Sequence, residues 1–106
     1  MRLAYPNDYA TIVAMITRCI RACFWLQYFL SLPGFDAGMH THSNDVWIVV
    51  IKGAYLYKDE DGEKRVGPGE FIRIPGGHKH WSGGDKKEGA LFYEEGSGKF
   101  DLIPAK

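Results

Sequence analysis

An excess of charge of either sign is absent from this 106-residue sequence. Thirteen lysine and arginine residues balance thirteen aspartate and glutamate residues, so the formal net charge at pH 7 is zero. Proteins that bind nucleic acid or anionic membrane surfaces normally carry a basic excess. The composition therefore predicts no nucleic-acid partner and no membrane partner.

Long apolar runs are missing as well. The segment 10–32 is rich in apolar residues, but Arg18, Arg21 and Gln27 interrupt it before it reaches the length of a membrane-spanning helix. The first residues do not lead into a compact apolar stretch that ends in a cleavage site. By default we expect a soluble, cytoplasmic protein, and secretion by a leader removed before Met1 stays open.

Cysteine is scarce, with only Cys19 and Cys23 present. On a regular strand these residues share a face, but four residues of extended chain hold them too far apart for a disulfide. A Cys-x-x-x-Cys metal site would need two further ligands. We predict buried or interfacial thiols, and nothing in the sequence requires an oxidising compartment.

Motifs for nucleophilic hydrolysis and phosphate binding are also missing. The sequence contains no nucleophile elbow and no phosphate-cradling glycine loop, and its glycines fall at turns. A chain of 106 residues with 45% hydrophobic content is long enough for one core and too short for two. We therefore predict a single domain over residues 1–106.

Histidine is rare too, and all four histidines occur in two His-x-His pairs. His40 and His42 precede the β-branched run 46–51, and His78 and His80 follow a Pro-Gly-Gly turn. Residues two apart on a strand share a face, so each pair directs two imidazoles toward one point. Neutral imidazole is the commonest protein ligand of divalent transition metals. The pairs predict a mononuclear metal site, with exposed or core histidines as the alternative.

Two stretches of the sequence resemble the motifs of the cupin superfamily. Residues 38–53 contain a glycine, the first His-x-His pair and a strand closed by glycine. Residues 69–84 contain a glycine, five residues, Pro-x-Gly, two residues and a histidine, and the intervening 54–68 matches the spacing of compact microbial cupins. The resemblance implies a jelly-roll β-barrel or sandwich. It does not select a function, since cupins include enzymes, sugar-binding domains and sensors.

Carried onto this sequence, the resemblance implies His40, His42 and His80 as metal ligands. Cupins normally have a glutamate or glutamine four residues after the second histidine, and this position is Val46 here. Asp45 would replace it only if a bulge re-aimed its side chain, because residue 45 faces the other side of the strand. We expect a three-histidine site, with Asp45 as a possible fourth ligand.

Short strands separated by turns predict an all-β protein. The expected strands are 9–16, 24–32, 35–42, 46–51, 54–57, 63–66, 71–74, 78–82, 90–94 and 100–103, with either a connection or a helical turn at 17–22. Trp25 and Phe29 share one face of 24–32, and that face is too apolar to be left in water. We predict a homodimer to which region 1–34 contributes, unless the first strand covers this face.

Three neutral imidazoles leave a bound metal with its full positive charge and with open coordination positions, as in catalytic centres. We favour copper or iron, one per chain, while zinc, nickel or manganese also suit such a site. His78 has the same strand parity as His80. We predict it at the rim of the site as a catalytic group that donates to a bound oxygen, with a solvent-facing turn position as the alternative.

Aromatic residues lie in or beside the motif strands. We predict that Trp47, Trp81 and Tyr93 bind substrate, because such rings line pocket mouths and stack on sugars, and packing in the core is the alternative. Four charged residues are expected to be exposed or paired between strands, namely Glu70, Arg73, Lys79 and Glu94.

The favoured function is a metal-dependent oxidoreductase that activates dioxygen or peroxide and oxidises a small organic or carbohydrate substrate. Oxidative polysaccharide cleavage and dioxygenase-type cleavage are both compatible with it, and the sequence is similar at the ligand positions to three-histidine cupins that cleave diketone-type bonds. One alternative is a non-catalytic zinc- or sugar-binding module. Another is a metal-dependent isomerase or lyase without redox chemistry.

Overall fold

The computed structural model describes residues 18–19 and 25–106, and the side chains from residue 32 onward. The described residues form ten strands: β1 (Arg18–Cys19), β2 (Trp25–Ser31), β3 (Asp36–Thr41), β4 (Val46–Gly53), β5 (Tyr55–Asp59), β6 (Gly62–Val66), β7 (Phe71–Ile74), β8 (His80–Gly84), β9 (Ala90–Gly96) and β10 (Ile103–Pro104). The predicted strand 9–16, Cys23 and the side chains of Cys19, Trp25 and Phe29 lie outside the described part. No helix of that part is long and apolar enough to cross a membrane.

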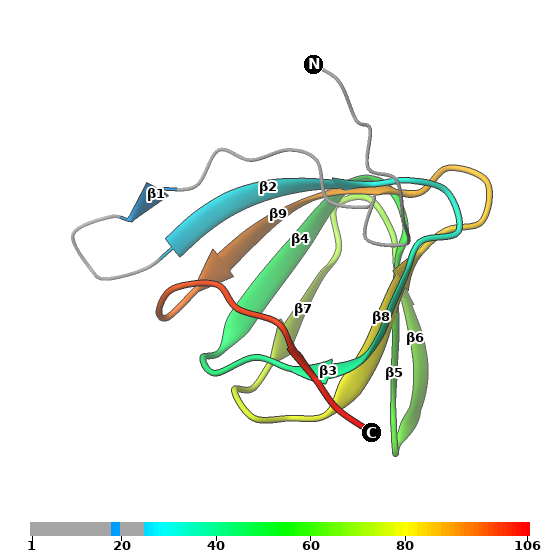
Figure 1. Cartoon of the computed structure of the whole chain (residues 1–106). Helices are drawn as coiled ribbons and strands as arrows, with labels where there is room; N and C mark the ends of the chain where they lie inside the picture. Colours follow the sequence, from blue (N-terminus) through cyan, green and yellow to red (C-terminus); the bar gives the residue numbers. More distant parts are fainter. Residues whose placement is uncertain (1–17, 20–24) are drawn as a thin grey trace.

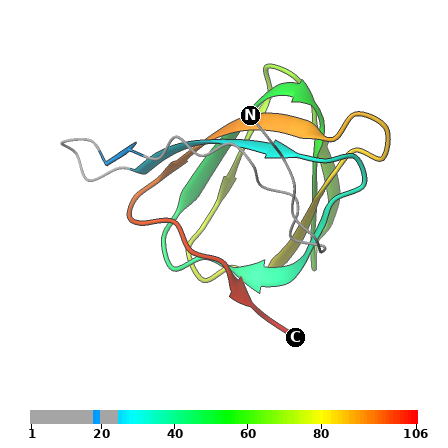
Figure 2. The same cartoon turned by 45° about the horizontal axis from the view of Figure 1, so that its top comes forward.

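The strands build two antiparallel sheets, in the orders β1-β2-β9-β4-β7 and β10-β3-β8-β5-β6. Figure 1 shows the two sheets facing each other, and the turned view of Figure 2 shows the strands arranged around a common interior. The segment after β9 runs from the first sheet to the edge of the second, where β10 pairs with β3 (Figure 1). This architecture confirms the predicted all-β fold and is consistent with a jelly-roll sandwich.

Alternation of side chains places the core between the sheets. On β4, Val46, Ile48 and Val50 are buried, and the residues between them point to the other face. Removing such apolar surface from water is the main stabilising contribution in a domain of this size. The core cluster comprises Val46, Ile48, Val50, Tyr55, Tyr57, Val66, Ile72, Ile74, Ala90 and Phe92, with Phe100 packed against it.

Gly53 allows the chain to turn from β4 into β5. Its φ is +75°, and a Cβ atom at this position would lie 2.9 Å from the carbonyl carbon of Gly89 and would collide with the oxygen of that carbonyl. The same oxygen accepts a hydrogen bond of 3.0 Å from the backbone nitrogen of Ala54. A left-handed backbone conformation and a close backbone approach therefore both require glycine here.

Candidate metal centre

Three histidines from neighbouring strands converge in the interior. His40 lies on β3 directly opposite His80 on β8, and His42 follows the end of β3. The side chains of His40, His80 and His42 are 1%, 0% and 5% exposed, respectively. One potential ligand atom from each lies within 4.8 Å of the others, and their ring centroids are 4.3 to 5.2 Å apart. The His-x-His pattern thus brings both predicted segments to one point.

Backbone carbonyls hold all three imidazole rings by the same ring nitrogen. The contacts from Nδ1 to the carbonyl oxygen are 2.8 Å for His40 to Gly38, 2.6 Å for His42 to Asp101 and 2.8 Å for His80 to His78. A carbonyl only accepts, so each Nδ1 donates its proton and each Nε2 keeps its lone pair. The Nε2 atom of His80 is buried without a hydrogen-bond partner. This buried nitrogen, together with the imidazoles of His40 and His42 beside it, forms a donor set that fits a divalent transition metal.

The surroundings keep these rings neutral. Burial lowers the pKa of His40 and of His42 below the ordinary histidine value. For His80, burial together with the neighbouring imidazoles lowers the pKa to about 4. All three lone pairs are therefore available at neutral pH, as metal binding requires.

A bulge before His40 sets the position of its carbonyl partner. The pairing register between β3 and β8 shifts between Asp36 and Gly38, and Gly38 has a φ of +72°. Oδ1 of Asp36 accepts hydrogen bonds from the Gly38 backbone nitrogen at 2.8 Å and from Nε1 of Trp81 at 2.6 Å. These contacts fix the backbone whose carbonyl orients His40.

The C-terminal segment orients His42 from far away in the sequence. The Asp101 carbonyl accepts from His42, and the Asp101 carboxylate accepts from the backbone nitrogen of Ser43 at 2.8 Å and from the Ser43 hydroxyl. The ring of Phe100 lies beside that of His42, with centroids 5.6 Å apart. The contacts of Phe100 and Asp101 with the residues at the end of β3 are therefore part of the metal centre.

Replacing Asp101 with alanine is expected to weaken metal binding about 10-fold, because losing the carboxylate releases Ser43 and loosens the carbonyl that orients His42. Competition with a chromophoric zinc chelator measures the affinity. The matched control is Asp61→Ala at the exposed tip of the β5–β6 hairpin, which should bind zinc as the unmodified protein does. Equal affinities for the two variants would contradict this positioning role.

His78 is predicted as a catalytic group at the rim of the site, and in the structure its ring contacts Asp59. Its Nε2 lies 3.0 Å from Oδ2 of Asp59, and the Tyr57 hydroxyl donates to the same oxygen at 2.8 Å. These two partners lower the pKa of Asp59 to about 2. The Tyr57 ring stacks on His80 at 5.3 Å. The His78 imidazole is thus engaged with Asp59 instead of the cluster, and only its carbonyl acts on a candidate ligand.

The prediction of Asp45 as a fourth ligand is not met by the structure. Its Oδ2 accepts from Nη2 of Arg73 at 2.8 Å, and its Oδ1 accepts from the Gly76 backbone nitrogen at 2.8 Å. β4 pairs with β7 in regular register from Val46 onward. Without a bulge, the opposite strand parity keeps Asp45 away from the histidines. Among the described residues, the only group with metal-ligand geometry is the three-histidine cluster.

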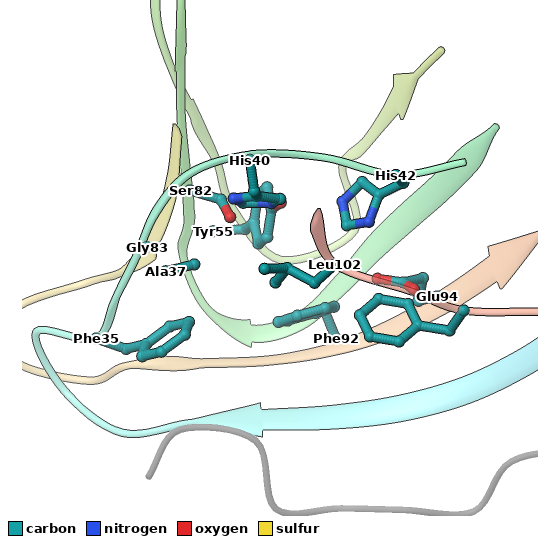
Figure 3. Close-up of a pocket in the computed structure, with 11 residues that line it drawn as sticks. Phe35, Ala37, His40, His42, Tyr55, Ser82, Gly83, Phe92, Glu94 and Leu102 are labelled. Atoms are coloured by element: carbon teal, nitrogen blue, oxygen red, sulfur yellow. The ribbon is translucent and has the colours of Figure 1, made fainter. Parts of the chain in front are cut away.

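A small cavity of about 30 Å³ adjoins the cluster. Figure 3 shows His40 and His42 on one side and Phe92 and Glu94 on the other. The lining is mainly apolar and consists of Phe35, Ala37, His40, His42, Tyr55, Ser82, Gly83, Phe92, Glu94, Phe100 and Leu102. This space holds roughly two water molecules, so a larger ligand has to extend toward the mouth of the cavity or displace lining side chains.

The three aromatic residues predicted to bind substrate do not line this cavity. Trp47, Trp81 and Tyr93 alternate with inward-facing residues, so they lie on the outer faces of their strands. Lys58 lies 5.0 Å above the Trp81 ring, Arg73 lies 5.8 Å from the Trp47 ring, and the Tyr93 hydroxyl lies 3.5 Å from Glu95. The aromatic residues that do line the cavity are Phe35, Tyr55, Phe92 and Phe100.

Glu94 was expected among the exposed or paired charges, and the structure corrects this expectation. It is 5% exposed, and burial raises its pKa to about 8. It lies on the same face of β9 as Ala90 and Phe92, which are also buried. That alternation was readable in the sequence and could have placed Glu94 on the inner face.

Replacing Glu94 with glutamine should stabilise the metal-free protein at alkaline pH. In the folded protein the pKa of Glu94 is about 8, above the ordinary value of 4.5. The free energy of unfolding of the unmodified protein therefore falls as the pH rises from 4.5 through 8. Without that ionisation, E94Q should be more stable than the unmodified protein at pH 8 by on the order of 3 kcal/mol. At pH 4.5 the difference should be much smaller.

Urea unfolding at both pH values measures this difference in stability. The control is E95Q on the outer face of β9, and a difference that does not depend on pH would contradict the raised pKa of Glu94.

The chain belongs to the cupin family, because the Cupin domain matches residues 28–94. No curated protein sequence matches it significantly. Among solved structures, the fold is similar to that of the DMSP lyase DddQ from Ruegeria pomeroyi, with a TM-score of 0.79, 13% identity and coverage of 96% of this chain and 55% of that one. A protein of unknown function from Rhizobium leguminosarum aligns with a TM-score of 0.73, 20% identity and coverage of 84% and 83%. A cupin-like protein from Thermotoga maritima aligns with a TM-score of 0.68, 17% identity and coverage of 80% and 68%.

Proposed function

We propose that this cupin is a mononuclear metal-dependent oxidoreductase in which His40, His42 and His80 hold one copper or iron ion through Nε2. The observation that carries the proposal is the shared tautomer of the three rings, whose Nδ1 atoms are bound to carbonyls while their Nε2 atoms stay available inside the barrel. When bound, such a metal supplies open coordination positions for a substrate oxygen and for dioxygen or peroxide.

The cavity supports a small organic substrate better than a polysaccharide. Phe35, Phe92 and Phe100 contribute apolar surface to its wall, which favours a molecule small enough to enter and excludes bulk water from the reaction. The tryptophans that could stack on a sugar chain, Trp47 and Trp81, lie outside this lining. We therefore narrow the proposed reaction to dioxygenase-type or oxidase-type chemistry on a small molecule.

A second candidate is a metal-dependent isomerase or lyase without redox chemistry. The observation that favours it is Glu94, a buried carboxyl on the cavity wall that is suited to proton transfer near neutral pH. A lyase, DddQ, is among the proteins of similar fold. In this candidate the metal acts only as a Lewis acid.

Metal analysis followed by reconstitution separates the candidates. The protein is purified without added metal, assayed for metal content, and loaded separately with Cu²⁺, Fe²⁺ and Zn²⁺. The proposal predicts one metal per chain and consumption of dioxygen or peroxide with copper or iron in the presence of small hydroxy and carbonyl compounds. One metal per chain without any oxygen or peroxide consumption would reject the oxidoreductase and leave the second candidate. Failure to bind metal would reject both.

A further inference from the structure

We infer that Glu94 is the catalytic acid–base group of the cavity, and that it exchanges a proton with a carbon atom of a small, uncharged, enolisable carbonyl compound. The inference rests on the proposed metal site, because the carbonyl oxygen of that compound would lie on the histidine side. It adds a residue with a stated role and a substrate class to the proposed function.

The position of Glu94 is the first support. Two candidate ligands lie on β3 and β8 of one sheet and the third directly follows β3, whereas Glu94 belongs to β9 of the other sheet. Both sides contribute to the lining of the same cavity, with His40 and His42 on one wall and Glu94 on the other (Figure 3). A small molecule in the cavity is therefore held between the metal ligands and a carboxyl group.

The lack of a partner for this carboxyl is the second support. No hydrogen bond or ion pair joins Glu94 to any group in the described part of the chain, and its register partners are Ile48 on β4 and Gln27 on β2. Besides this cavity, Glu94 contacts a smaller pocket that also includes His42. A buried carboxyl is costly unless it is paired, and a ligand in the cavity would supply a partner for it.

The composition of the lining indicates the charge of the substrate. No lysine or arginine of the described residues lines the cavity, so apart from a metal held by the histidines no group of this lining could neutralise a carboxylate or phosphate on the substrate. The other titratable lining groups are His40, His42 and Tyr55. Two of these are candidate ligands, and burial raises the pKa of Tyr55, which keeps its proton. Glu94 is thus the lining group left to carry a proton between atoms of a neutral molecule.

The proposed step conserves atoms and electrons. The Glu94 carboxylate takes a proton from the carbon beside the carbonyl group. The electron pair of that C–H bond forms a C=C bond, and the carbonyl π pair moves onto the oxygen to give an enolate. The protonated carboxyl then returns the proton to a carbon or to the oxygen. No external oxidant or reductant is needed for this exchange.

Solvent-deuterium exchange tests the inference with zinc as a redox-inert metal. Hydroxyacetone and butanone are incubated in D₂O with the zinc-loaded protein, and proton NMR follows loss of the signals beside the carbonyl. We expect exchange above the rate with free zinc for the unmodified protein and for the matched control E95Q, and at least about 100-fold slower exchange for E94Q. Exchange at the unmodified rate in E94Q, or none above background in the unmodified protein, would overturn the inference.

A second readout does not depend on turnover. In zinc-loaded protein labelled with ¹³C-carboxyl glutamate, the signal that E94Q lacks belongs to Glu94, and we expect it to shift when hydroxyacetone is added. An unchanged signal would also overturn the inference. The zinc content distinguishes failure of the Glu94 role from failure of the proposed function. One zinc per chain in E94Q shows that the metal site is intact in this variant. A lack of zinc in the unmodified protein contradicts the proposed function itself.

Discussion

Replacing His42 with alanine is expected to lower the affinity for zinc or copper more than about 100-fold and to leave the fold intact. Changing a group that only orients a ligand typically costs roughly 10- to 100-fold, and this change removes a ligand itself. The site has three donors and no carboxylate among them. Once His42 is removed, only His40 and His80 remain, and no other described residue is placed to replace the lost ligand. Chelator competition measures the affinity, and circular dichroism checks the fold.

The sequence provides a matched control for this change in the second His-x-His pair. His78→Ala removes an imidazole that binds Asp59 and leaves the carbonyl that holds His80. This variant should keep one metal per chain at nearly the original affinity. Retention of metal by the His42 variant, or equal losses in both variants, would show that the ligand assignment is wrong.

Replacing Gly53 with alanine is expected to give the largest loss of stability, about 3 kcal/mol or more in the free energy of unfolding. The new Cβ would collide with the Gly89 carbonyl group, so the backbone between β4 and β5 would have to move. The positive φ adds a further cost for any residue with a side chain. Urea denaturation measures the change.

Gly34 separates the two causes. It has the same φ of +75°, and apart from its chain neighbours no described residue has a heavy atom within 4 Å of the place that an alanine methyl group would take, so Gly34→Ala carries the backbone strain without the collision. We expect a loss of about 1 kcal/mol for this control. Similar losses in the two variants would show that backbone strain alone, and not the approach to Gly89, requires glycine at position 53.

Alternation of side chains predicted most of the described strands, because the barrel buries one face of each. The segment 71–74 agrees residue for residue with β7, and the turn between β5 and β6 falls between the expected strands 54–57 and 63–66. The expected last strand, 100–103, is instead the two-residue β10 preceded by a segment that contacts the metal centre. The path of that segment depends on its contacts with Ser43 and β3. Its own local sequence contains no pattern that predicts these distant contacts.

The same rule explains which site residues were predicted well and which were not. Period-2 spacing placed His40 and His42 on one face and kept Asp45 off it. It would also have placed Trp47, Trp81 and Tyr93 outside the barrel, but the prediction relied on their aromatic character instead of their parity. For His78 the rule does not apply, because β8 begins at His80 and the turn before it does not alternate.

Long-range contacts at the centre have no counterpart in local sequence patterns. The carbonyl that holds His42 belongs to Asp101, 59 residues away, and any residue type could supply a carbonyl. Stacking of Tyr57 on His80 likewise depends on the pairing of β5 with β8. These contacts follow from the closed fold, so only the structure reveals them.

A crystal structure of the zinc-loaded protein tests the central claim most directly. We expect one ion at about 2.0 to 2.1 Å from Nε2 of His40, His42 and His80, with each Nδ1 still bound to its backbone carbonyl. An ion bound through Nδ1, an ion held by other residues, or rings that point away from one another would contradict it.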